Sequence, residues 1–128
     1  MARLVLKKCE KMQAGKLGSL YMFNIRPAAC GGFVGKYGFT KDLERRAQEH
    51  ARLYRPDPIY LVCSAPVDVR LMREAEEELR YRLRGIHAGP DHFRKYDIPR
   101  GREIVLVQWG DLPWVERVYQ ELMLDFKN

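Results

Sequence analysis

Apolar residues in the first half of the chain form short runs separated by turn-forming residues. The segment Ser19–Ile25, SLYMFNI, is rich in apolar and aromatic residues and predicts a strand. RPAACGG then supplies turn chemistry, and GFVGKYGFT at 32–40 predicts a second strand, so that the two form a hairpin. After a break at RPDP, the short apolar run IYLVCSA at 59–65 predicts a third strand that is buried.

Helical spacing of apolar residues predicts three helices. The first begins at a Thr40 cap, has Asp42 and Glu44 in its first turn, and runs to about Tyr54. The second covers about 67–84. The third is capped by Asp111, and its apolar stripe consists of Val115, Val118, Tyr119, Leu122 and Phe126.

The remaining segments complete a small α+β protein. EIVLVQW at 103–109 predicts another strand, whereas the Gly- and Pro-punctuated segment 85–101 is expected to be a loop. This order of elements predicts a mainly antiparallel sheet flanked by helices. With no repeat or linker, we expect one domain over 1–128, with a core at about 19–93 and a strand and helix added at about 102–127.

Two polar residues of the first helix take inward positions. Leu43, Ala47, Ala51 and Tyr54 define its apolar face. His50 falls on that face, either as a satisfied core residue or as a functional one, and Arg46 lies one turn earlier at its flank. Arg45 and Arg52 project to the solvent side.

The second helix has an acidic residue where an apolar one is expected. Its stripe of Val69, Met72, Leu79 and Leu83 is completed by Glu76, while Glu74, Glu77 and Glu78 form a solvated charge run. A carboxylate that faces the core costs several kcal/mol unless it is paired or holds a metal. Glu76 is therefore expected either to form an internal ion pair with an arginine such as Arg46, or to bind a cation.

The excess of basic over acidic residues favours polyanionic partners. Lys and Arg number 23 against 17 Asp and Glu, and the sequence pI is about 9.4. This balance favours nucleic acid or an acidic membrane surface as a partner, although basic domains without such partners are common.

The cysteines and the hydropathy of the chain indicate in which cellular compartment the protein is expected. Cys9, Cys30 and Cys63 are odd in number and include no C-x-x-C pair, so neither a disulfide framework nor a zinc knuckle is expected. MARLVLKKCEKM has too short an apolar run for a signal peptide, and no segment approaches the roughly 18 apolar residues of a membrane span. We expect an intracellular protein with no membrane partner, cytoplasmic, or nuclear in a eukaryotic or viral host.

Residues 36–50, KYGFTKDLERRAQEH, resemble the second half of the GIY-YIG nuclease motif. With Gly38 as the motif glycine, the family's arginine and histidine fall on Arg46 and His50, the two residues that helical spacing turns inward. SLYMF resembles the GIY strand, with Tyr21 as its tyrosine and Ser19 in place of its glycine. AEEELRYRL resembles the helix that carries the metal-binding glutamate, here Glu76.

The resemblance covers about 19–93 and is closest to the phage and large-DNA-virus subgroup with a K-x-G second strand. The chain departs from the family pattern at the second tyrosine, which is replaced by Lys36; Tyr37 follows on the opposite face of the strand. The spacer between the two strand motifs is longer than usual, and no counterpart exists for the asparagine of some family sites. Gly38, Tyr37 and Thr40 are expected to have structural roles in the motif.

The resemblance implies a metal-dependent endonuclease that hydrolyses phosphodiester bonds, in DNA or RNA, with DNA the expected substrate. A single Mg²⁺ or Mn²⁺ would be held by Glu76 and waters. Arg46 would bind the scissile phosphate. Tyr21 and His50 would be catalytic, with Tyr21 activating or orienting the attacking water. Lys36 would replace the missing tyrosine in proton or charge handling, or simply bind phosphate.

Two alternatives remain open. A noncatalytic nucleic-acid-binding module would keep the fold and lose turnover at Lys36. A metal site at His87, Asp91 and His92 has too few ligands for tetrahedral zinc. Because the chain has no zinc finger or helix-turn-helix, specificity is expected from the domain, a homo-oligomer or a protein partner.

Overall fold

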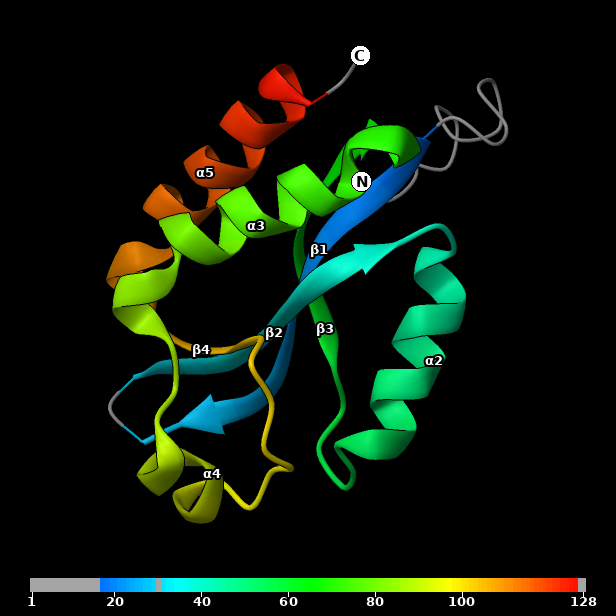
Figure 1. Ribbon diagram of the computed structural model, residues 1–128. Helices are drawn as coiled ribbons and strands as arrows, with labels where there is room; N and C mark the ends of the chain where they lie inside the picture. Colours follow the sequence, from blue (N-terminus) through cyan, green and yellow to red (C-terminus); the bar gives the residue numbers. More distant parts are fainter. Residues whose placement is uncertain (1–16, 30, 127–128) are drawn as a thin grey trace.

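The computed structural model describes residues 17–29 and 31–126, so that Cys9, Cys30 and the unassigned first dozen residues lie outside the described ranges. The chain forms a four-stranded sheet in the order β3-β1-β2-β4, and every neighbouring pair is antiparallel (Figure 1). The sheet and its helices confirm the predicted α+β class. The main elements are β1 (Leu17–Ala28), β2 (Gly32–Thr40), α2 (Leu43–Leu53), β3 (Tyr60–Asp68), α3 (Met72–Arg82), α4 (Pro90–Lys95), β4 (Ile104–Gln108) and α5 (Leu112–Asp125).

Strands β1 and β2 form the predicted hairpin at the centre of the sheet. Tyr21 pairs with Gly38, and Phe23 pairs with Lys36. Because side chains alternate along a strand, Tyr21 and Lys36 lie on the same face of the hairpin. The turn ends at Gly32, where φ is +151° and an added Cβ would lie 2.2 Å from the carbonyl oxygen of Val107, so glycine is required there.

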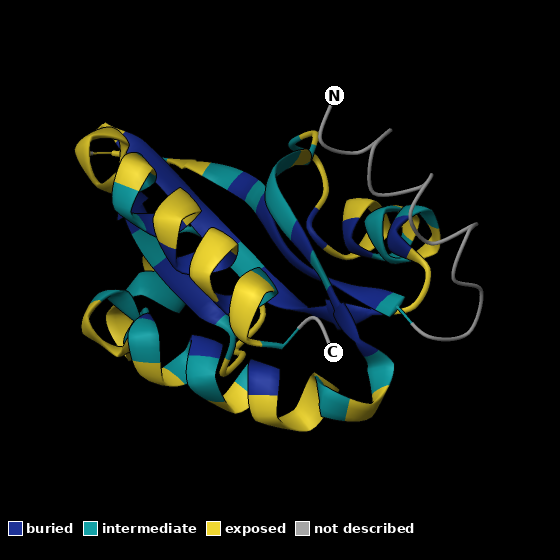
Figure 2. Ribbon diagram, turned by 90° about the horizontal axis from the view of Figure 1, so that it is seen from above, coloured by how far each residue is buried: buried dark blue, intermediate teal, exposed yellow. Residues whose placement is uncertain are grey.

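Buried side chains fill both faces of the sheet, which lies between helices (Figure 2). One face packs against α3 and α5, through residues that include Leu79, Leu83 and Val118. The other face packs against α2, through Leu43 and Tyr54. Tyr37 belongs to the first cluster and Tyr21 to the second, as the alternation of side chains predicts.

Helix α2 begins two residues later than predicted, and the expected Thr40 cap is wrong. Asp42 is the cap, and its Oδ1 accepts a hydrogen bond from the backbone N–H of Arg45 at 3.1 Å. Thr40 is the buried last residue of β2, and its Oγ1 accepts a hydrogen bond from the N–H of Asp42 at 3.1 Å. Ala51 is exposed rather than part of the apolar face.

The segment 67–84 is not one helix. Val67 and Asp68 still pair with β1, and a 3₁₀ turn precedes α3. Ala75 is fully buried where Glu76 was expected, while Met72, predicted to be in the core, is 38% exposed. Leu79 and Leu83 are buried as predicted, so the departure from the predicted stripe is confined to the start of α3.

Three other expectations need correction or extension. β3 is an edge strand with an exposed Tyr60, not a fully buried strand. The expected loop 85–101 contains the short helix α4. The strand and helix beyond the resembling region are integral to the sheet and core, because β4 pairs with β2 and the stripe of α5 is buried from Val115 to Leu122.

Helix α5 also contacts the backbone of the central strand. The fully buried hydroxyl of Tyr119 donates a hydrogen bond to the carbonyl oxygen of Tyr21 at 2.6 Å.

None of the described helices is both long enough and apolar enough to cross a lipid bilayer.

Candidate active site

The hydroxyl of Tyr21 is the point at which β1 and α2 meet. Arg46 Nη1 donates a hydrogen bond to it at 3.1 Å, and His50 Nε2 lies 3.2 Å from it. Arg46 and His50 are four residues apart, so consecutive turns of α2 present both side chains to the same hydroxyl. The structure therefore brings together three of the residues that the sequence singled out.

The direction of these two hydrogen bonds follows from chemistry. A guanidinium has no acceptor, so the Tyr21 oxygen must accept from Arg46. Burial, with a smaller contribution from the positive charges of Lys36 and Arg46, lowers the pKa of His50 to about 4. The imidazole is consequently neutral at pH 7, and its Nε2 can accept the Tyr21 proton.

His50 is held in an aromatic cage. The rings of Phe23 and Tyr54 each have centroids 5.7 Å from that of the imidazole. Its Nδ1 is buried and has no hydrogen-bond partner among the described residues. His50 therefore has one polar contact within the described structure, and this contact is with Tyr21.

The phenol of Tyr21 stays protonated at neutral pH. Burial raises the pKa of Tyr21 above its ordinary value of 10, and the neighbouring charge and hydrogen bond of Arg46 oppose the rise. Tyr21 is thus a hydroxyl donor towards His50, with a cation beside its oxygen.

Lys36 is held by an acidic residue that sequence reasoning missed. Its Nζ lies 2.6 Å from Glu103 Oε1, and Arg80 Nη2 lies 3.7 Å from the other oxygen of the same carboxylate. Lys36 pairs with Ile104 across β2 and β4, and Glu103 lies in the turn directly before β4, where its carbonyl oxygen accepts a hydrogen bond from the N–H of Tyr37 at 3.1 Å. The only sequence signal was an acid directly before an apolar run, and its partner is 67 residues away.

Glu76 is half-buried and has no hydrogen bond or ion pair within residues 17–29 and 31–126. Burial raises its pKa, the negative charge of Glu103 raises it further, and the charges of Arg80, Arg46 and Lys36 oppose the rise. The proposed internal ion pair with Arg46 is not formed, because Arg46 Nε instead pairs with Glu49 Oε1 at 3.0 Å.

Tyr37 has a partner on the opposite face of the sheet. Its hydroxyl lies 2.7 Å from His87 Nε2, and the two rings are stacked with centroids 5.7 Å apart. Burial raises the pKa of Tyr37 to about 12. Tyr37 therefore does not take the place of the missing motif tyrosine beside Tyr21.

The three residues of the alternative zinc site have separate partners. His87 contacts Tyr37, Asp91 pairs with Arg94 at 2.5 Å, and His92 Nδ1 accepts a hydrogen bond from the N–H of Gly89. In the described part of the chain, no group of three or more His, Cys, Asp or Glu side chains is arranged to hold a metal ion. The described contacts thus do not unite these residues in one site.

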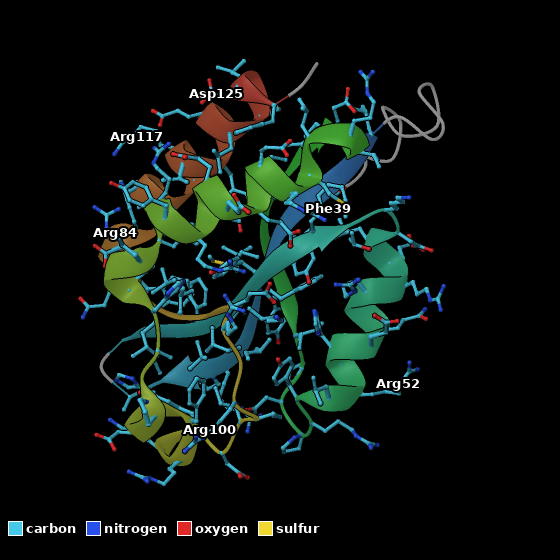
Figure 3. The ribbon with its side chains drawn as sticks, in the orientation of Figure 1. Phe39, Arg52, Arg84, Arg100, Arg117 and Asp125 are labelled. Atoms are coloured by element: carbon cyan, nitrogen blue, oxygen red, sulfur yellow. The ribbon has the colours of Figure 1, made fainter. Side chains whose placement is uncertain are left out.

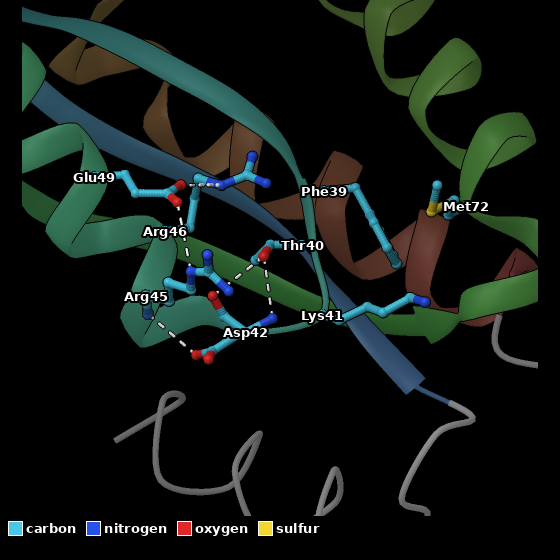
Figure 4. A pocket seen from close by; sticks show the side chains of 8 residues that line it. All are labelled: Phe39, Thr40, Lys41, Asp42, Arg45, Arg46, Glu49 and Met72. Atoms are coloured by element: carbon cyan, nitrogen blue, oxygen red, sulfur yellow. Dashed lines mark hydrogen bonds and ion pairs between the residues drawn. The ribbon is translucent and has the colours of Figure 1, made fainter.

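A groove opens next to Arg46, between the start of α2, the end of β2 and the start of α3 (Figure 4). Its volume is about 430 Å³. The groove is lined by Phe39, Thr40, Lys41, Asp42, Arg45, Arg46, Glu49 and Met72.

Comparisons with known proteins add no family to this geometry. No protein-family model matches the chain, and no curated protein or solved structure matches it. The function is therefore inferred from the residues and their arrangement.

Proposed function

We propose that the protein is a metal-dependent endonuclease that hydrolyses phosphodiester bonds in nucleic acid, with DNA the expected substrate. The observation that carries the proposal is the convergence of Arg46 and His50 on the Tyr21 hydroxyl, at 3.1 and 3.2 Å. This arrangement combines a phosphate-binding cation, a hydroxyl and a neutral base in one site, in the order that the GIY-YIG resemblance implies.

The residues of the site fit a divalent cation. Glu76 is a half-buried carboxylate with a raised pKa and no ion pair among the described residues, so a bound cation would supply its missing counter-charge. Mg²⁺ or Mn²⁺ accepts one carboxylate with several waters, and Glu76 is the residue that would hold it. Such an ion stabilises negative charge on a phosphoryl oxygen and acidifies bound water.

The protein's own groups then have separate tasks. Arg46, whose side chain is 35% exposed, donates to the scissile phosphate while keeping its hydrogen bond to Tyr21. Tyr21 orients the attacking water. As the water oxygen bonds to phosphorus and the scissile P–O bond breaks, the Tyr21 oxygen takes a proton from that water and its own hydroxyl proton passes to His50 Nε2, so that the phenol remains neutral. The leaving oxygen takes its proton from solvent water.

Lys36 gives a specific reason to keep a second candidate, a noncatalytic nucleic-acid-binding module. Its ammonium forms a hydrogen-bonded ion pair with Glu103 at 2.6 Å. Lys36 stands in the place of the second tyrosine of the GIY-YIG motif. A protein that uses Lys36 only to stabilise the sheet edge would bind nucleic acid without cutting it.

The experiment is incubation of the purified protein with single-stranded, duplex and branched DNA and RNA, with magnesium or with a chelator. The nuclease proposal requires cleavage that the chelator abolishes. Binding that weakens with salt, because phosphate neutralisation releases counterions, together with an absence of cleavage would support the noncatalytic module. Binding that is unchanged between low and high salt would contradict both.

A further inference from the structure

The groove beside Arg46 has two chemically different walls (Figure 4). Met72 at the start of α3 and Phe39 near the end of β2 form an apolar wall, and Met72 is 38% exposed there. Arg45 and Arg46 lie on the α2 side of the groove, whereas the Lys41 side chain extends beneath Phe39 and Met72 (Figure 4). A flat apolar ligand that also carries negative charge matches this combination.

The acidic residues of the groove are already partnered. Asp42 Oδ1 caps α2, and Glu49 pairs with both Arg46, at 3.0 Å, and Arg45, at 3.7 Å. Lys41, by contrast, is exposed and has no hydrogen bond or ion pair with any described residue. Phosphate is therefore favoured at Lys41, and a base with its sugar is favoured against the adjoining apolar wall.

The groove is continuous with the candidate active site through Arg46, which lines the groove and hydrogen-bonds Tyr21. Its volume of about 430 Å³ falls within the roughly 300–1,000 Å³ of small-ligand sites. This suits one extruded nucleotide, because enzymes that take a base out of the stack bind it in a pocket of this kind.

We propose that the groove binds one unpaired nucleotide next to the scissile phosphate, so that the protein prefers single strands, flaps or bulges to continuous duplex. The inference rests on the proposed nuclease function and adds a substrate class to it. Met72 supplies a sulfur contact to the base, since thioethers contact aromatic rings favourably. Lys41 supplies a phosphate contact on the adjoining nucleotide.

The test measures binding of a fluorescent single-stranded oligonucleotide, and of the same strand in a duplex, in the presence of a chelator. Met72→Ala should weaken single-strand binding about two- to tenfold and leave duplex binding nearly unchanged. Lys41→Ala should lower the salt dependence of single-strand binding by about one counterion. The matched controls are Leu124→Ala and Arg117→Ala, at exposed positions of α5, and these variants should bind both substrates like the wild type. Arg117 is labelled in Figure 3.

The wild-type protein is then tested for cleavage of the same substrates with magnesium. Cleavage of duplex as fast as single strand, with a Met72→Ala variant that binds like the wild type, would overturn the groove inference and leave the nuclease proposal standing. Selective single-strand binding that is lost in Met72→Ala, without cleavage of any substrate, would support the groove and overturn the nuclease proposal. Equal weakening on both substrates would also overturn the groove inference.

Discussion

Gly38 lies directly against the hydroxyl end of Tyr21, its partner across the hairpin. A Cβ added at Gly38 would be 2.6 Å from Tyr21 Oη and 2.9 Å from Cζ, closer than side chains tolerate. The motif glycine therefore leaves room for the tyrosine hydroxyl rather than providing backbone freedom. The position of that hydroxyl in turn sets where Arg46 and His50 meet it.

Gly38→Ala should displace the Tyr21 hydroxyl and lower cleavage about 100-fold, since a misplacement of about 1 Å in an active site has this order of effect. The overpacking should also cost about 1–3 kcal/mol of stability. Cleavage rates and urea unfolding check both effects. Gly85→Ala is the matched control, because a Cβ there meets no atom within 4 Å. A Gly38→Ala protein that cuts at the wild-type rate would contradict the role given to Tyr21.

Arg46→Ala should reduce cleavage about 10²–10³-fold, the usual effect of removing a donor that stabilises developing charge. Arg45→Ala should reduce cleavage less than about tenfold, because its side chain is 78% exposed and does not contact Tyr21. Single-turnover rates at saturating protein separate this effect from binding. Equal losses in the two variants would rule out the assignment to Arg46.

Glu76→Gln should abolish cleavage while leaving nucleic-acid binding and the fold intact. Loss of a buried ion pair would cost about 3–5 kcal/mol, but Glu76 has no such partner among the described residues, so the unfolding free energy should stay the same or rise. Thermal melts with and without magnesium provide a second measurement, in which the wild type gains stability from the ion and Glu76→Gln does not. Glu77→Gln serves as the control, since Glu77 is exposed. Strong destabilisation of Glu76→Gln, or an unchanged magnesium response, would refute the metal role.

His50 should make folding stability depend on pH. Its pKa in the folded protein, about 4, lies below its ordinary value of 6.5, so the stability it contributes is fully present above pH 6.5 and is lost as the pH falls towards 4. The stability of the wild type relative to His50→Gln should fall by up to about 3 kcal/mol over this range. Urea unfolding at several pH values measures it, and NMR titration of the imidazole reports the pKa directly. A His50 that titrates near 6.5 would contradict the neutral acceptor role.

Local periodicity predicted those parts of the fold and site that lie within one element. The inward positions of Arg46 and His50 follow from the spacing in α2, and the buried stripe of α5 follows in the same way. The Lys36–Glu103 pair was not predictable, because it depends on which strand lies beside β2. The burial of Met72 was wrongly predicted because residues up to Asp68 remain paired in β3, so that α3 begins only at Met72.

The hydrogen bond from Tyr119 to the Tyr21 carbonyl oxygen joins α5 to the strand that carries the tyrosine of the candidate site. Detachment of α5 would remove a buried hydrogen bond to the backbone of that tyrosine. We therefore expect the C-terminal helix and the site to unfold together as one cooperative unit. The amide hydrogens of β1 and α5 should consequently exchange with similar protection. A change that destabilises α5 should also perturb the position of Tyr21.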